Sequence, residues 1–223
     1  MNIIVATSTV EDGSMYNRRD MSDSAIITNR KNFLAANGID ISQTTRAKIT
    51  YDRTDFCQYG SVDASQKGSG MTDNNAVILD ALITTDSQHA LFLPIADCVG
   101  AVLFDPIHHI LALAHFGRHA LEQDGGRKLV TYLTEHYASD PSQLNIWLTP
   151  AAGKDVYPIW ALDNKGMKEV MFEQLFAAGV LYENIIDNPT ETTSDLHYFS
   201  YSEHLKGHRT EDGDHAIVAM MTD

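Results

Sequence analysis

Four apolar runs in the middle of this chain constrain its fold more than any other feature. Each run has the length of a β-strand, and turn-forming residues separate it from the next. A strand that is apolar along its whole length needs cover on both faces of its sheet. The sequence therefore predicts a sheet packed on both sides, with strands at Ile78–Thr84, Ala90–Ile95, Val99–Phe104 and Ile110–His115.

Further strands and a few helices flank this central block. Helices are predicted from Ser24 to about Asn37, after His115 to about Tyr137, and over residues 165–178; strands are predicted at residues 2–7, 47–51, 145–148 and 215–221. Strands outnumber helices, so a simple doubly wound arrangement does not fit. The expected class is α/β (α+β), one domain over residues 1–223, with mixed sheets and helices on the outer faces.

Composition narrows the range of partners. The chain has 30 acidic and 16 basic residues, a formal net charge of -14. Such a surface repels phosphate backbones, so neither nucleic acid nor an anionic membrane is an expected partner. A small anionic ligand in a local basic pocket stays compatible with this charge. Apolar residues make up 43% of the chain, which is typical of a globular protein with a substantial core.

The N-terminus and the cysteines bear on the cellular compartment. The first residues lack the basic leader of a signal peptide, and no run approaches the roughly 18 apolar residues of a membrane-spanning helix. Cys57 and Cys98 are the two cysteines, and nothing else points to an oxidising compartment. The expectation is a cytoplasmic protein with reduced thiols.

Cys98 and His115 are the first candidates for chemistry. Cys98 lies where one apolar strand ends and the next begins, and His115 ends a later strand just before a predicted helix. Open sites are often built at strand ends, and thiolate and imidazole are common zinc ligands. The alternative is structural, because a single cysteine between apolar strands is often a small core residue. No Cys-x-x-Cys or His-Glu-x-x-His motif decides between these interpretations.

Four segments resemble a known family. The run from Ile78 to Gly117 is similar to the core of the laccase-domain family, also called the multicopper polyphenol oxidase or purine nucleoside phosphorylase-like family, which reads ADALVT, TADCVPVLL and VAAVHAGWRG. Three shorter segments resemble its ENRRRL helix, its GPAIG…Y loop and its FFSYRR segment in the same order: residues 28–34, residues 149–157 and residues 198–201.

The resemblance implies an α/β/β/α sandwich, a zinc site formed by His, Cys and His, and activity on purine nucleosides by phosphorolysis or adenosine deamination. Cys98 matches the cysteine ligand and His115 the second histidine. Asp52 stands where the first histidine is expected. Aspartate can bind zinc, although it is a harder ligand than imidazole. The implied catalytic and metal-binding set is therefore Asp52, Cys98 and His115, with one zinc ion per chain.

Several arginines of the family pattern are changed here. The arginine after the histidine is shifted by one position to Arg118, and the paired arginines after the FSY segment become Ser202 and Glu203. Phosphate is the anion that arginine binds best, so phosphorolysis is the activity most affected. Arg30, Arg118 and His119 are expected to supply a contact to the sugar or to an anion such as phosphate.

Three functions remain open on this sequence. The leading hypothesis is a zinc-dependent enzyme of purine nucleoside metabolism. The second is a hydrolase or deamidase with Cys98 as nucleophile and His115 as base. The third is a degenerate family member that binds a nucleoside or a partner without turnover. Copper oxidation is not expected, because the chain lacks the His-x-His pairs of multicopper oxidases.

Overall fold

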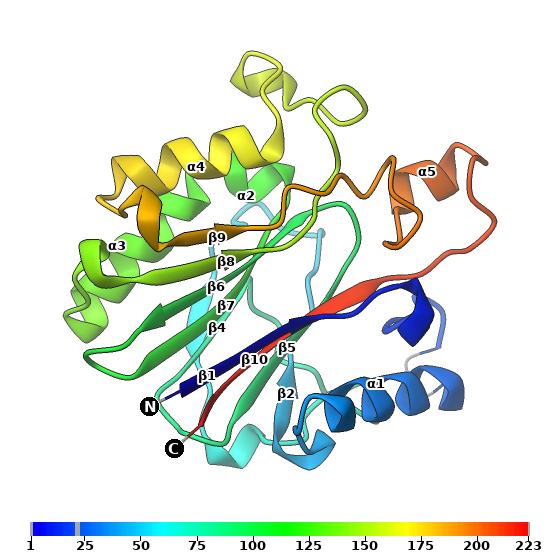
Figure 1. Ribbon diagram of the computed structural model, residues 1–223, viewed down its shortest axis with the longest axis horizontal. Helices are drawn as coiled ribbons and strands as arrows, with labels where there is room; N and C mark the ends of the chain where they lie inside the picture. The colour runs from blue at the N-terminus through cyan, green and yellow to red at the C-terminus, as the bar shows by residue number, and fades with distance from the viewer. Residues whose placement is uncertain (1, 21–22, 223) are drawn as a thin grey trace.

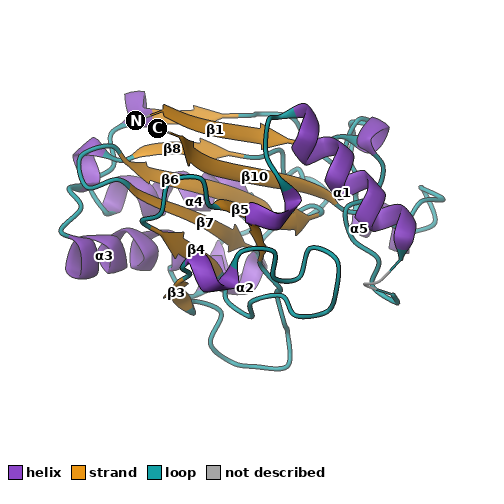
Figure 2. Ribbon diagram, turned by 90° about the horizontal axis from the view of Figure 1, so that it is seen from below, coloured by secondary structure: helices purple, strands orange, loops and turns teal. Residues whose placement is uncertain are grey.

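The computed structural model describes residues 2–20 and 23–222 and arranges them in four layers. Two β-sheets pack face to face, with α1 on one outer side and α3 and α4 on the other (Figure 1). The α/β/β/α arrangement expected from the sequence is therefore present. Figure 2 shows the strands of the two sheets running in roughly the same direction, as in aligned sheet packing.

The smaller sheet has four strands in the order β1-β10-β5-β2. These are β1 (Asn2–Thr7), β10 (His215–Thr222), β5 (Ala90–Ile95) and β2 (Thr44–Arg46). β10 pairs antiparallel with β1 and with β5, whereas β2 pairs parallel with β5. Helix α1 (Ser24–Ala36) covers the outer face and begins at Asp23, whose side chain accepts a hydrogen bond from the Ala25 backbone N–H.

The larger sheet has six strands in the order β3-β4-β7-β6-β8-β9. Its strands are β3 (Tyr59–Ser61), β4 (Ala81–Thr84), β7 (Ile110–Phe116), β6 (Val99–Asp105), β8 (Asn145–Leu148) and β9 (Ile185–Asp187). The helices α2 (Arg118–Glu122), α3 (Gly125–Tyr137) and α4 (Met167–Ala177) cover its outer face; α5 (Tyr201–Leu205) lies apart from them (Figure 1). None of the described helices combines the length and the apolar character needed to span a membrane.

The packing explains why the central strands are continuously apolar. Leu91 and Leu93 of β5 pack between the two sheets, with Val102 and Leu113 of the larger sheet. Phe92, which alternates with them, packs on the opposite face against α1. Both faces of β5 are therefore buried, as the sequence predicted. Burying apolar area at roughly 25 cal/mol per Å² makes these faces the main source of stability.

Three predicted elements are different in the structure. The strand predicted over residues 47–51 is absent apart from one bridge between Ala47 and Val77. The helix predicted to run to Tyr137 is two helices, separated at Gln123 and Asp124, because Asp124 has a φ of 63° that no α-helix can include. β4 starts at Ala81 rather than Ile78, whose side chain is 52% exposed.

The chain crosses from one sheet to the other between β5 and β6. These consecutive strands belong to different sheets, and only residues 96–98 join them. Asp97 turns the chain with a φ of 70°, a left-handed conformation that aspartate tolerates better than most side chains. The crossing leaves Cys98 at the junction of the two layers.

Candidate functional site

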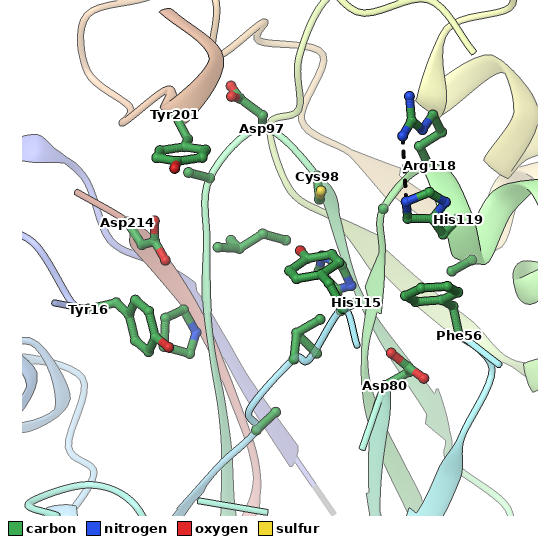
Figure 3. A pocket seen from close by; sticks show the side chains of 18 of the residues that line it. Tyr16, Phe56, Asp80, Asp97, Cys98, His115, Arg118, His119, Tyr201 and Asp214 are labelled. Carbon is green, nitrogen blue, oxygen red and sulfur yellow. Dashed lines mark hydrogen bonds between the residues drawn. The ribbon is translucent and has the colours of Figure 1, made fainter. Parts of the chain in front are cut away.

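A cavity of about 570 Å³ lies at this junction. Its size is within the range of small-molecule sites. Figure 3 shows Cys98 and His115 between two groups of side chains. We call these groups the aromatic end, with Phe56, Arg118 and His119, and the acidic end, with Tyr16, Tyr201 and Asp214. Tyr51, which neighbours Phe56, belongs to the aromatic end, and Arg18, which pairs with Asp214, belongs to the acidic end; all of these residues line the cavity.

The register of β6 and β7 brings Cys98 and His115 together. Val99 pairs with Phe116, so the residues just outside this pair, Cys98 and Gly117, face each other. A Cβ atom placed on Gly117 would lie 3.0 Å from the Cys98 Sγ and 2.9 Å from the His115 Cε1. The thiol and the imidazole therefore border the same small space, which is open because residue 117 has no side chain.

Both groups are uncharged near neutral pH. Burial, together with the nearby Asp97 carboxylate, raises the pKa of the Cys98 thiol to about 12. Burial, together with the Arg53 guanidinium, lowers the pKa of His115 to about 4. The site therefore presents a protonated thiol and a neutral imidazole to the cavity, not a thiolate–imidazolium pair.

Asp97 fixes the turn that carries Cys98. Its Oδ1 accepts a hydrogen bond of 2.7 Å from the Thr192 hydroxyl, and its Oδ2 accepts one of 2.7 Å from the Ser202 backbone N–H. Its carbonyl oxygen accepts a third hydrogen bond, from the Ala152 backbone N–H at 2.7 Å. Asp97 thus joins the turn to three other segments, and both of its carboxylate oxygens are engaged by the protein.

Substituting Gly117 by alanine is expected to destabilise the protein by about 1–3 kcal/mol, because the added methyl group collides with Cys98 and His115. Urea unfolding measures this loss. Gly166→Ala is the matched control, since its φ is also ordinary and its added Cβ would have Lys154 as its nearest neighbour, with 3.1 Å to the Lys154 Cβ and 3.7 Å to the Lys154 Cα. Equal unfolding midpoints for the two variants would contradict the packing described around Gly117.

The aromatic end consists of rings in contact. Phe56 stacks on His119 with ring centroids 4.7 Å apart, and Tyr51 lies 6.4 Å from Phe56. Arg118 and His119 both approach Glu122, at 3.8 and 3.5 Å. The positive charge of Arg118 is therefore partly compensated by Glu122, and the surface offered to a ligand is mainly aromatic.

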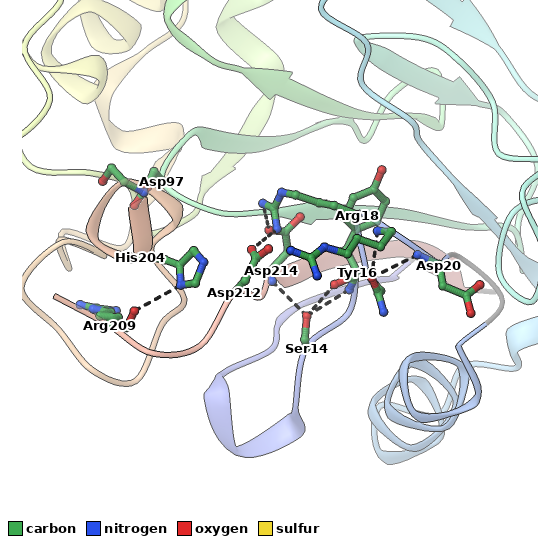
Figure 4. A network of polar contacts seen from close by, with 12 residues as sticks. Ser14, Tyr16, Arg18, Asp20, Asp97, His204, Arg209, Asp212 and Asp214 are labelled. Carbon is green, nitrogen blue, oxygen red and sulfur yellow. Dashed lines mark hydrogen bonds and ion pairs between the residues drawn. The ribbon is translucent and has the colours of Figure 1, made fainter. Parts of the chain in front are cut away.

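The acidic end is organised around Arg18 (Figure 4). The Arg18 guanidinium pairs with Asp212 and with Asp214, each at 2.6 Å, and its Cζ lies 4.1 Å from the centre of the Tyr201 ring. Burial raises the pKa of Asp214 to about 6, although the pairing with Arg18 opposes this shift. One guanidinium facing two carboxylates leaves this end negative when both carboxylates are ionised.

A buried ion pair lies beneath the cavity near His115. The Arg53 Nη2 pairs with the Asp80 Oδ1 at 2.5 Å, and the Asp80 Oδ2 accepts a hydrogen bond from the Gln58 backbone N–H. The Asp80 carbonyl oxygen in turn accepts a hydrogen bond from the His115 backbone N–H at 2.8 Å. This pair anchors the chain between β2 and β3 against the strand that carries His115.

The expected zinc ligands do not assemble in this structure. Asp52 is exposed and does not line the cavity, whereas its neighbour Tyr51 does. The reason is local: residues 48–58 form no strand, so the alignment with a family strand misplaces Asp52. Over residues 2–20 and 23–222, no three His, Cys, Asp or Glu side chains are grouped so that they could hold a metal ion. Of the three expected ligands, Cys98 and His115 line the cavity and Asp52 does not, and this pair does not fit a three-ligand site.

Arg30 is a second correction. Arg30 was expected to contact substrate, but its side chain is fully buried on the inner face of α1 and does not line the cavity. Its guanidinium donates hydrogen bonds to the backbone carbonyl groups of Met15 and Met71, at 2.8 and 2.9 Å. Arg30 therefore holds two loops in place. Arg118 and His119, the other residues expected to bind substrate, do line the cavity.

The acidic end was not predicted from the sequence as part of the site. Arg18 and Asp214 are 196 positions apart, and no local pattern relates them. His215, predicted as the first residue of the last strand, is fully buried at the start of β10, with its ring centroid 5.3 Å from that of Tyr198.

The fold and the match of residues 15–162 to a family model define the class of this protein. The model describes the multi-copper polyphenol oxidoreductase laccase family, and it covers more than half of the chain. The chain belongs to that family, which is the one suggested by its motifs.

Individual relatives agree with this assignment. The protein named purine nucleoside phosphorylase YlmD of Bacillus subtilis (strain 168) is 24% identical over 139 residues, which are 61% of this chain and 49% of YlmD. The match therefore spans about half the length of that protein. The crystal structure of YlmD from Geobacillus stearothermophilus has a TM-score of 0.85 at 20% identity, covering 99% of this chain and 92% of that one. The Bacillus licheniformis hypothetical protein YfiH has a TM-score of 0.83 at 18% identity, covering 99% of this chain and 93% of that one. At these identities the structural likeness shows the fold alone.

Proposed function

We propose that this protein is an enzyme that binds a purine nucleoside in the junction cavity and cleaves its N-glycosidic bond next to Cys98 and His115. The observation that carries the proposal is the division of the cavity into an aromatic end and an acidic end with these two side chains between them. A purine nucleoside has the same division, into a flat aromatic base and a hydroxyl-rich sugar. The printed name of the YlmD relative supports the same substrate class.

Charge favours a nucleoside over a nucleotide. Three cationic side chains and three aspartates line the cavity: Arg18, Lys48 and Arg118, and Asp80, Asp97 and Asp214. Arg18 is held by two carboxylates, and Arg118 lies 3.8 Å from Glu122. The cavity therefore lacks the surplus of positive charge that binding of a dianionic phosphomonoester needs.

The two central groups have separate roles in this proposal. Cleavage transfers C1′ of the ribose from the base nitrogen to an oxygen of water, which the charge of the cavity favours over hydrogen phosphate, and the departing base takes up the proton that the nucleophile loses. The neutral His115 ring can accept the proton of the attacking hydroxyl. The Cys98 thiol borders the same space and can orient that nucleophile as a hydrogen-bond donor. No step requires a metal ion, since the expected ligand set does not assemble.

The two alternatives from the sequence have less support. A cysteine nucleophile needs a thiolate, and the raised pKa of Cys98 keeps this thiol protonated. A binding protein without turnover does not need uncharged groups at the centre of its cavity. Adenosine deamination involves the same ligand and is distinguished from bond cleavage by its product.

Incubation of the purified protein with adenosine or inosine, with and without phosphate, tests the proposal. Chromatography is expected to show free adenine or hypoxanthine. Ribose 1-phosphate appears only with phosphate if phosphate is the nucleophile, and free ribose appears if water is. Inosine formed from adenosine would instead show deamination. Neither product, despite measurable nucleoside binding, would favour a binding role.

A further inference from the structure

The three aspartates of the cavity wall differ in how the protein uses their oxygens. Asp80 has both oxygens engaged, by the Arg53 guanidinium and the Gln58 backbone N–H. Asp97 also has both engaged, by the Thr192 hydroxyl and the Ser202 backbone N–H. Neither carboxylate is available to serve as the main acceptor for a ligand. Asp80 and Asp97 instead hold neighbouring segments of the chain in place around the cavity.

Asp214 differs from both. Its Oδ1 accepts a hydrogen bond from Arg18 at 2.6 Å, whereas its Oδ2 has no hydrogen-bond partner among the residues that the structure describes. The residue is only 6% exposed, and the surface it retains lines the cavity. The Asp214 Oδ2 is not among the fully buried atoms that lack a partner, so it stays accessible from the cavity, and a ligand that supplies a donor can bind there.

The orientation of this carboxylate is fixed before any ligand arrives. Its backbone N–H donates to the Ser14 hydroxyl at 3.1 Å, and its carbonyl oxygen accepts from the Met15 backbone N–H at 2.8 Å. Arg18 holds Oδ1, and Asp212 holds the other end of the same guanidinium (Figure 4). An acceptor with so little freedom loses little entropy when it binds a donor.

From this geometry we infer that Asp214 is the specificity-determining residue that accepts hydrogen bonds from the ribose hydroxyl groups. The inference rests on the proposed function and adds the orientation of the nucleoside in the cavity. The ribose lies at the acidic end against Asp214, and the purine lies at the aromatic end near Phe56 and His119. The glycosidic bond then lies between the two ends, beside Cys98 and His115.

The chemistry of the two ends supports this orientation of the nucleoside over the opposite one, in which the purine would lie at the acidic end. An ionised carboxylate only accepts hydrogen bonds, and the two vicinal hydroxyl groups of a ribose can each rotate to donate to it. Nucleotide-binding proteins use a carboxylate to bind a ribose hydroxyl in the same way. A purine offers its flat faces to stacking, which the contacting rings of the aromatic end provide.

Equilibrium binding of adenosine and of 2′,3′-dideoxyadenosine, measured by calorimetry, tests the inference. The wild-type protein is expected to bind adenosine about tenfold more tightly, the usual effect of one hydrogen bond to a charged acceptor. Asp214→Ala is expected to remove this preference. Asp212→Ala is the matched control, because Asp212 pairs with the same guanidinium but does not line the cavity, and it should keep the preference.

The possible outcomes distinguish a failure of the inference from a failure of the proposed function on which it rests. Binding of neither nucleoside by the wild-type protein would overturn the proposed function and the inference together. Equal affinity of the wild-type protein for both ligands would overturn the inference alone, as would a preference that survives in Asp214→Ala. If the alanine variant does not fold, Asp214→Asn takes its place, since it keeps the side-chain size and removes the charge.

Discussion

Replacing His115 with glutamine is expected to lower nucleoside turnover by about 100-fold or more, the usual contribution of a positioned acid–base group. Glutamine keeps hydrogen-bonding capacity but cannot take up a proton from the nucleophile. His115 is nearly buried and its backbone is held within β7, so the fold should survive the change. Initial rates at saturating adenosine or inosine measure the loss, and the dissociation constant should change only a few-fold.

His136→Gln is the control for this experiment. His136 lies on α3, is exposed, and does not line the cavity. Its replacement should leave turnover at the wild-type level. If His115→Gln retained full turnover, the reaction would take place elsewhere in the cavity, and the acidic end would be the next place to look.

Arg30→Ala is expected to cost roughly 3–5 kcal/mol of stability, because it removes buried side-chain volume and several hydrogen bonds together. The Arg30 guanidinium donates to the carbonyl groups of Met15, Gly70 and Met71, so three acceptors lose a donor. Burial and the neighbouring Arg46 lower the pKa of Arg30 to about 10, so it stays charged near neutral pH. Urea denaturation measures the change.

Lys31→Ala is the matched control, since Lys31 is the next residue of α1 and is exposed. It should change stability by less than about 0.5 kcal/mol. In the folded fraction of Arg30→Ala, nucleoside affinity should equal that of the wild-type protein, because Arg30 does not line the cavity. A large loss of affinity with little loss of stability would restore Arg30 to the substrate site.

The central strands were predictable because they are buried on both faces, which requires apolar residues along almost their whole length. β5 and β8 have the predicted limits, Ala90–Ile95 and Asn145–Leu148, since turn residues bound each run. Cys98 and His115 were identified for the same reason, because strand limits also define strand ends. Their approach to each other depends on the antiparallel register of β6 and β7, which the sequence alone does not fix.

The errors have physical causes. Asp52 was placed by aligning a loop with a strand, where a small shift in register changes which side chain faces inward. Arg30 was treated as a possible ligand contact, although it lies four residues after Ile26 and three before Phe33. That spacing puts it on the buried face of the helix. The positive charge of Arg30 suggested an exposed side chain, whereas its spacing from Ile26 and Phe33 indicates a buried one.

The acidic end was beyond the reach of the sequence. Tyr201, Asp212 and Asp214 lie outside the matched residues 15–162, and Arg18 contacts them in a fold where β1, near the start of the chain, pairs with β10 at its end. Contacts between the two ends of a chain leave no periodic trace. Proteins that share the matched region can therefore differ in the part of the cavity proposed here to bind ribose.

The crossing at Asp97 makes the cavity sensitive to residues far from it. Cys98 lies where the chain passes from one sheet to the other, so its position depends on how the two sheets are placed relative to each other. Leu93 and Val102 pack in the interior between the sheets, and neither lines the cavity. A change of volume at either position shifts one layer against the other. Substitutions in the interior between the sheets can therefore change the position of Cys98, while every side chain that lines the cavity stays the same.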